Sequence, residues 1–115
     1  MTAWVADELR IASRRADGSL RRFITIWAVR DGDDLYVRSA HGYDNPWFQR
    51  ALHSGRGRIE AGGIERDVSF AVPEPDAAAR VTAAYHAKYD RYGPSIVGTV
   101  VSPEAERASL RVEPR

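Results

Sequence analysis

The stretch 57–72 reads GRIEAGGIERDVSFAV and predicts a β-hairpin. Its centre, Gly62-Gly63, supplies the positive φ angles that a two-residue turn between paired strands requires. One of the resulting cross-strand pairs is apolar and another joins opposite charges, as stable pairs commonly do. The turn sets three opposed pairs: Ala61 with Ile64, Ile59 with Arg66, and Arg58 with Asp67. The stretch therefore predicts two strands together with their register.

A second hairpin is predicted upstream. Residues Leu20 to Arg30 are rich in β-branched and aromatic side chains, which favours a strand. The turn residues Asp31 to Asp34 and a second strand, Leu35 to Ser39, complete the hairpin. Both faces of the first strand are apolar, so we expect one to line the core and the other to pack on a helix, a ligand or another subunit. The faces are Leu20, Ile24, Ile26 and Ala28, and Phe23, Thr25, Trp27 and Val29.

Three segments have the apolar spacing of a helix. They are Thr2 to Ser13, a segment that begins at Asn45-Pro46 and ends at Gly55, and a segment that follows Pro73-Glu74-Pro75 and stops at Gly93-Pro94. In the second, Asn45 can cap the free N–H groups, and proline is tolerated at the first helical position. The third carries an apolar, tyrosine-rich stripe that we expect to pack on the sheet: Ala78, Val81, Tyr85, Tyr89 and Tyr92.

The C-terminal part is expected to hold a strand at Ile96 to Val101, a helical turn at Ser102-Pro103-Glu104 and a strand at Leu110 to Glu113. Helices and hairpins thus alternate without the regular strand–helix–strand order of a parallel sheet. This order predicts an α+β fold, with a mostly antiparallel sheet of about five or six strands and short flanking helices.

The composition bounds the function. With 115 residues the chain predicts one domain over residues 1–115, and its net charge of +1 gives no overall field for nucleic acid or a membrane surface. There are no cysteines, which excludes disulfides, thiolate catalysis and cysteine-ligated metals. We find neither a signal peptide nor an apolar run of transmembrane length, and expect a cytoplasmic protein.

A family resemblance rests on the order of motifs in residues 20–72. A Thr-x-Trp step at Thr25 and Trp27 leads to the strand Leu35 to Ser39, then to Gly42 and to the helix start Pro46-Trp47-Phe48. This order resembles the split β-barrel proteins that bind flavin mononucleotide (FMN) or its deazaflavin analogue, including pyridoxamine-phosphate-oxidase-like and deazaflavin-dependent nitroreductase-like proteins. The whole chain is similar to a family of short bacterial proteins of unknown function, on the motifs DDLYVRS (33–39), GRIEAGG (57–63) and AYHAKY (84–89).

The resemblance implies a cofactor site at the end of the second strand. Its basic candidates are Arg21, Arg22, Arg38 and Arg50, since the planar guanidinium suits a phosphate, and the start of the helix at Pro46 adds partial positive charge. The alternative is that each of these arginines is solvated at a strand edge. The cofactor-binding residues that we predict are Arg22, Thr25, Arg38, Ser39, His41, Gly42, Trp47 and Arg50.

The loop and aromatic candidates have structural alternatives too. The loop with Ser39, His41 and Gly42 could contact the cofactor or be an ordinary polar loop. Five aromatic side chains could stack on a flat ring, and of these Trp27 and Phe48 are better explained as core, while Trp47 is the better ligand candidate. The five are Trp27, Tyr36, Tyr43, Trp47 and Phe48.

Two functions remain open at this point. The resemblance implies a flavin- or deazaflavin-dependent oxidoreductase of small molecules, and the alternative is a cofactor-free small-molecule-binding or interaction dimer on the same fold. No residue is identified as a catalytic acid or base. His41, His53 and His86 lie on different predicted elements, so no metal site is expected. The two apolar faces of residues 20–30 predict a homodimer.

Overall fold

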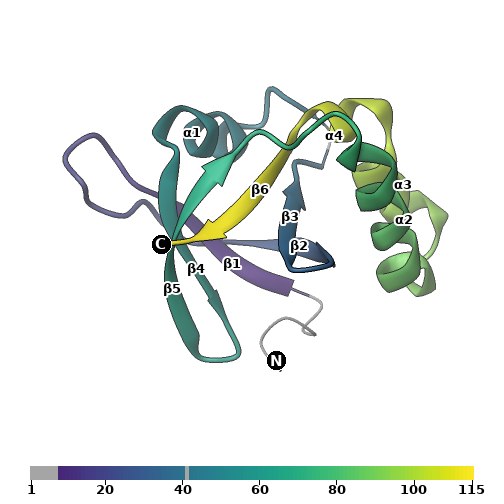
Figure 1. The fold of residues 1–115 in the computed structure, drawn as a ribbon, viewed down its shortest axis with the longest axis horizontal. Helices are drawn as coiled ribbons and strands as arrows, with labels where there is room; N and C mark the ends of the chain where they lie inside the picture. The colour runs from purple at the N-terminus through teal and green to yellow at the C-terminus, as the bar shows by residue number, and fades with distance from the viewer. Residues whose placement is uncertain (1–7, 41) are drawn as a thin grey trace.

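The computed structural model describes residues 8–40 and 42–115 and shows a closed antiparallel barrel of six strands with helices outside it (Figure 1). Neighbouring strands follow the order β1-β2-β3-β6-β5-β4, so the C-terminal strand lies between β3 and β5. The strands are β1 (Glu8–Ser13), β2 (Ile24–Asp31), β3 (Asp34–Arg38), β4 (Arg56–Ala61), β5 (Ile64–Ala71) and β6 (Ser109–Pro114). The predicted fold class and strand number are confirmed.

The helices are α1 (Pro46–Ser54), α2 (Ala77–Tyr89), the 3-10 turn η2 (Asp90–Tyr92), α3 (Pro94–Val101) and α4 (Pro103–Arg107). In Figure 1, α2 and α3 lie on one side of the barrel, and the loop that joins β1 to β2 projects on the other side. Among the described residues, no helix is long and apolar enough to cross a membrane.

The hairpin predicted from residues 57–72 forms with the expected register. Strands β4 and β5 pair Ala61 with Ile64 and Arg58 with Asp67, and the turn glycines have φ angles of 58° and 82°. Asp67 accepts hydrogen bonds from Arg58 at 2.9 Å and from Arg14 at 3.0 Å, and these bonds lower the pKa of its carboxyl. The glycine turn and one charged cross-strand pair were therefore enough to predict this hairpin and its register.

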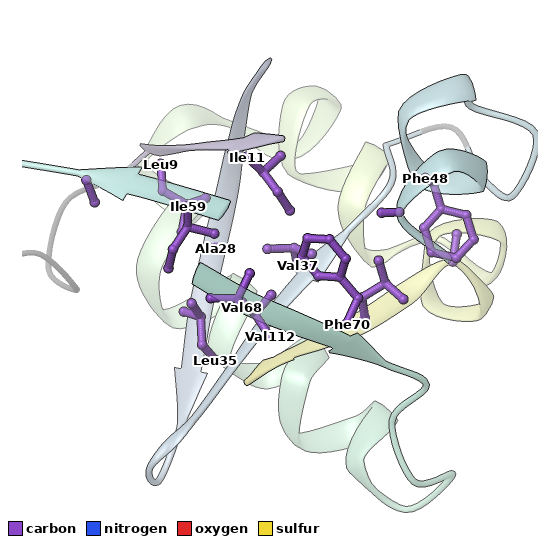
Figure 2. Close-up of a cluster of buried hydrophobic side chains, with 14 residues drawn as sticks. Leu9, Ile11, Ala28, Leu35, Val37, Phe48, Ile59, Val68, Phe70 and Val112 are labelled. Atoms are coloured by element: carbon purple, nitrogen blue, oxygen red, sulfur yellow. The ribbon is translucent and has the colours of Figure 1, made fainter. Parts of the chain in front are cut away.

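The two apolar faces of β2 have different partners, as expected. Ala28 points into the barrel, where it joins a cluster with Val37, Ile59 and Val68 from three other strands (Figure 2). Val29 faces outward and packs in a second cluster with α2 and α3. One strand thus joins the barrel core to the helical layer.

Two segments differ from the sequence-based expectation. Residues 8–13 form strand β1 rather than the end of a helix, because Leu9 and Ile11 alternate with exposed Glu8 and Arg10 and fill the barrel between β2 and β4. The rest of that predicted helix, residues 2–7, lies outside the described residues. In addition, β2 begins at Ile24 rather than at residue 20.

Residues 96–101 form most of helix α3 rather than a strand. Pro94 occupies the first turn of this helix, and Val97 and Val100, three residues apart, are both buried in the cluster that α2 forms. Packing on α2 therefore outweighs the β-propensity of these valines. The helical turn at residue 103 and the final strand are confirmed as α4 and β6.

Tyr89 of α2 satisfies backbone groups of β2. Its hydroxyl accepts a hydrogen bond from the Ala28 N–H at 3.1 Å and donates one to the Ala28 carbonyl at 2.8 Å. Ala28 follows Trp27, which is the last residue of β2 that pairs with a described residue of β1. Tyr89→Phe should lower the free energy of unfolding by about 1–3 kcal/mol, because it removes the oxygen to which the buried Ala28 N–H donates. Urea denaturation measures the change. Tyr92→Phe, which alters a side chain that is 41% exposed, is the control, and equal stability of both variants would contradict this role.

Candidate functional site

Two adjoining hollows lie between the start of α1, β2 and neighbouring elements. We call the first the tryptophan cleft; its volume is about 370 Å³, and it holds Trp27, Trp47 and Thr25 together with Ile96 and Thr99 of α3. The second, the arginine cleft, is about 430 Å³ and is lined by Arg15, Arg21, Arg22, Arg50 and parts of β1. Ile24 and Trp47 line both clefts, so the two are contiguous. Volumes of about 300–1,000 Å³ are usual for small-molecule sites.

Helix α1 positions Trp47 where the tryptophan cleft meets the arginine cleft. The helix begins with Pro46 and ends at Gly55, whose φ of 70° is in the left-handed region. Asn45 precedes it, but the Asn45 side chain makes no capping hydrogen bond, contrary to expectation. Phe48 is buried and anchors the helix on the barrel core, while Trp47 is half-buried and meets the Phe48 ring edge-on at 6.0 Å. The tryptophan is therefore held in place with part of its ring accessible.

Trp27 enters the tryptophan cleft from the outer face of β2. Its ring stacks on Tyr89 of α2 at 4.0 Å between centroids, with the planes 5° apart. Tyr85 also donates a hydrogen bond to the Trp27 carbonyl at 3.3 Å. One side of the Trp27 ring is thus covered by α2, and the part that Tyr89 leaves open lines the cleft.

The other aromatic candidates have structural surroundings. Tyr36 and Phe48 are no more than 1% exposed, which confirms the core interpretation of Phe48. Tyr43 is 49% exposed and touches Phe48 edge-on at 5.2 Å. These three line neither cleft, so the accessible aromatic surface of the site comes from the two tryptophans.

The arginines of the arginine cleft divide into anchored and unpaired ones. Arg15 donates to the Leu20 carbonyl at 2.9 Å and thereby fixes the loop between β1 and β2. Arg21, Arg22 and Arg50 make no side-chain hydrogen bond or ion pair with any described residue. Arg21 is half-buried, and the other two are exposed. Among the described residues, no carboxylate lines this cleft, so the charged groups of its lining are all positive.

Arg38 differs from the other predicted arginines because it is only 2% exposed. It donates to Ser109 Oγ, Thr82 Oγ1, the Val100 carbonyl and the Ala78 carbonyl, at 2.8–3.0 Å. Burial lowers the pKa of its guanidinium, and the Tyr85 ring lies 5.5 Å away. Arg38 reaches the floor of the tryptophan cleft, and it is not a solvated strand-edge arginine.

The loop after β3 packs on α4 rather than opening into either cleft. Ser39 is fully buried, and its N–H donates to the Ala108 carbonyl at 2.9 Å. Gly42 has a φ of 104°, and a Cβ there would approach Glu104 Cβ to 3.2 Å, so glycine permits a close contact with α4. His41 lies outside the described residues. Neither Ser39 nor Gly42 lines the two clefts.

The structure therefore brings together five of the eight predicted site residues: Arg22, Thr25, Arg38, Trp47 and Arg50. It adds Ile96 and Thr99, which the sequence analysis missed because it expected a strand there. The start signal Gly93-Pro94 and the spacing of Val97 and Val100 could have indicated the helix that carries them. Within the described residues, no group of three or more His, Asp or Glu side chains could hold a metal ion.

The comparisons with known proteins agree with this architecture. Residues 3–112 match the family described as "Uncharacterized protein conserved in bacteria (DUF2255)". The chain belongs to this family. No curated protein matches its sequence. The resemblance to flavin- and deazaflavin-binding split barrels is confirmed for the fold.

Three solved structures illustrate the likeness. An F420-H2 dependent reductase (FDR-A) has a TM-score of 0.67 at 12% identity, with 93% of each chain covered. An FAD-binding protein from Mesorhizobium loti has a TM-score of 0.59 at 13% identity, covering 98% of this chain and 84% of the other. A structure described as a domain-swapped dimer has a TM-score of 0.67 at 11% identity, covering 93% and 79%. At these identities the likeness extends to the fold, and the homodimer of this chain stays a prediction.

Proposed function

We propose that this protein binds a phosphate-bearing flavin or deazaflavin, with the ring in the tryptophan cleft and, in the arginine cleft, the phosphate nearest to the ring, which we call the first phosphate. The observation that carries the proposal is that the two clefts adjoin at Ile24 and Trp47, which line both. One cleft offers tryptophan surface and apolar side chains, and the other offers arginines without carboxylates. A ligand with a flat ring and a phosphate matches both: its ring suits the tryptophan cleft and its phosphate suits the arginine cleft.

The residues present fit such a group. Guanidinium groups bind phosphate through paired N–H donors, and Arg21, Arg22 and Arg50 have no described partner that would compete for them. Trp47 can pack on the ring, since it is held by Phe48 and needs little ordering on binding. Ile96 and Thr99 of α3 also line that cleft and would keep water from part of the ring.

The proposed reaction class is oxidation or reduction of a small molecule. A bound flavin or deazaflavin supplies hydride transfer, and the protein supplies binding and orientation. Fold likeness to an F420-H2 dependent reductase and an FAD-binding protein supports this class. The alternative, a cofactor-free dimer that buries the tryptophan cleft against a partner, keeps some support from Ile96, a cleft residue that is 51% exposed.

Titration with FMN and with an oxidised deazaflavin, followed by absorbance and tryptophan fluorescence, tests the proposal. We expect wild type to bind at least one of them well below millimolar. Arg50→Gln should weaken that binding about tenfold, the scale of one charge-assisted hydrogen bond. Arg66→Gln, an exposed arginine of β5 outside both clefts, is the matched control and should bind like wild type. If wild type binds neither ligand below about millimolar, the proposal fails in favour of the cofactor-free dimer.

A further inference from the structure

A third hollow continues the arginine cleft away from the tryptophans. We call it the outer cleft; its volume is about 580 Å³, and it shares Arg15, Arg21 and Arg50 with the arginine cleft. Its remaining walls come from the loop between β1 and β2, from α1 and from the start of β4. They are Arg14, Ala16, Gln49, His53, Ser54 and Arg56. The tryptophan cleft, the arginine cleft and the outer cleft therefore adjoin one another in this order, and we call the series the path.

The charge along this path is one-sided. Of the residues that the structure describes, six arginines and one histidine line the arginine cleft and the outer cleft, and no aspartate or glutamate does. The chain as a whole has 17 basic residues against 16 acidic ones, so this concentration is local. Some arginines elsewhere are paired, as Arg58 is with Asp67 and Arg80 with Asp31, each within 3 Å, and on the path Arg14 also pairs with Asp67. Crowded like charges with few counter-charges favour binding of anions.

The outer cleft has both fixed and available donors. Arg14 donates to the Gly18 carbonyl at 2.7 Å and to Asp67 at 3.0 Å, which holds the loop wall in place. Arg56, at the first position of β4, is exposed and makes no side-chain hydrogen bond or ion pair with a described residue. The outer cleft thus contains the guanidinium of Arg56, which has no described partner, and a loop that Arg14 holds in place.

From this arrangement we infer that the ligand of this protein carries a second anionic group beyond its first phosphate, and that the outer cleft binds this group. The inference rests on the proposed function. FMN has a single phosphate, which the arginine cleft alone can hold. The second group is either the further phosphate of a dinucleotide such as FAD or the carboxylates of a deazaflavin with an oligoglutamyl tail. Both have the chemistry that guanidinium groups recognise.

The test compares dissociation constants of FMN, FAD and deazaflavins with a short and a long glutamyl tail, at low salt because exposed charges are screened. We expect one extended ligand to bind about tenfold or more tightly than FMN. Arg56→Gln should remove most of that advantage and leave FMN binding unchanged, because Arg56 lines only the outer cleft. Arg22→Gln, which changes the arginine cleft alone, should weaken all the ligands alike. Arg66→Gln is the control for net charge.

The outcomes separate the two proposals. Preference for FAD places a phosphate in the outer cleft, and preference for the long-tailed deazaflavin places carboxylates there; either supports the inference. If FMN binds as tightly as both extended ligands, or if Arg56→Gln weakens FMN as much as them, the inference is overturned while the proposed function stands. If none of the ligands binds, both are overturned.

Discussion

Replacing Gly57 by alanine is expected to lower the free energy of unfolding by about 3 kcal/mol or more. Gly57 lies on β4, where it is opposite Ser13 of β1 and Val68 of β5. A Cβ at this position would overlap the Ala12 carbonyl oxygen and lie 2.9 Å from two carbons of the Phe70 ring. Overpacking of a core typically costs about 1–3 kcal/mol, and here one of the overlapped atoms is backbone that cannot rotate away.

The clash lies between β1 and β4, the two strands whose pairing closes the barrel. To make room, β1 must move away from β4, which loosens the pairing of Ile11 with Ile59 and of Ala12 with Arg58. Gly98→Ala is the matched control, since it makes the same chemical change inside helix α3, where a Cβ would meet nothing within 4 Å. It should stabilise the protein by about 0.5–1 kcal/mol through helix propensity. Urea denaturation of both variants gives the comparison, and a Gly57→Ala protein as stable as wild type would contradict the position of β1.

The parts of the fold that the sequence predicted correctly depend on neighbouring residues. The register of β4 and β5 follows from the turn at Gly62 and Gly63 and from a single charge pair. The start and end of α1 follow from Pro46 and Gly55. Each of these signals lies within the element that it defines, so no knowledge of distant contacts is needed.

The errors come from segments whose partners are distant in the chain. Strand β1 pairs with residues 24–27 and 57–60, and Leu9 with Ala12 fits a helical face until those partners are known. Helix α3 is rich in β-branched residues, and its helical state depends on burial of Val97 and Val100 near Tyr89. Both short segments fit the helical and the strand spacing of apolar residues, and in each it is packing on distant parts of the chain that selects one of them.

The candidate site was predicted as one group, and the structure divides it. Trp47 and Arg50, one turn apart on α1, both line the arginine cleft. Ser39 and Gly42 instead contact Ala108 and Glu104, more than sixty residues later in the chain. No local pattern reports that contact, and this is why a loop that looked suited to a ligand turned out to be packed against α4.

Arg38→Ala is expected to lower the free energy of unfolding by about 2–4 kcal/mol, or the melting temperature by roughly 10 °C. The variant leaves a cavity in place of a long buried side chain. It also removes the donor for the Val100 and Ala78 carbonyls, on α3 and α2, and for the Ser109 hydroxyl on β6. Those bonds join β3 to three other elements, so their loss should separate the helical layer from the barrel.

Two measurements distinguish this structural role from the direct phosphate contact that the sequence suggested. Differential scanning calorimetry gives the stability change, with Arg66→Ala on the exposed face of β5 as the control expected to melt like wild type. Titration with FMN, well below the melting temperature of the variant, gives the effect on binding. Because Arg38 is 2% exposed and its guanidinium makes four hydrogen bonds inside the protein, Arg38→Ala should weaken FMN binding less than Arg50→Gln does. An unchanged melting temperature together with tenfold weaker binding would show instead that Arg38 contacts the ligand.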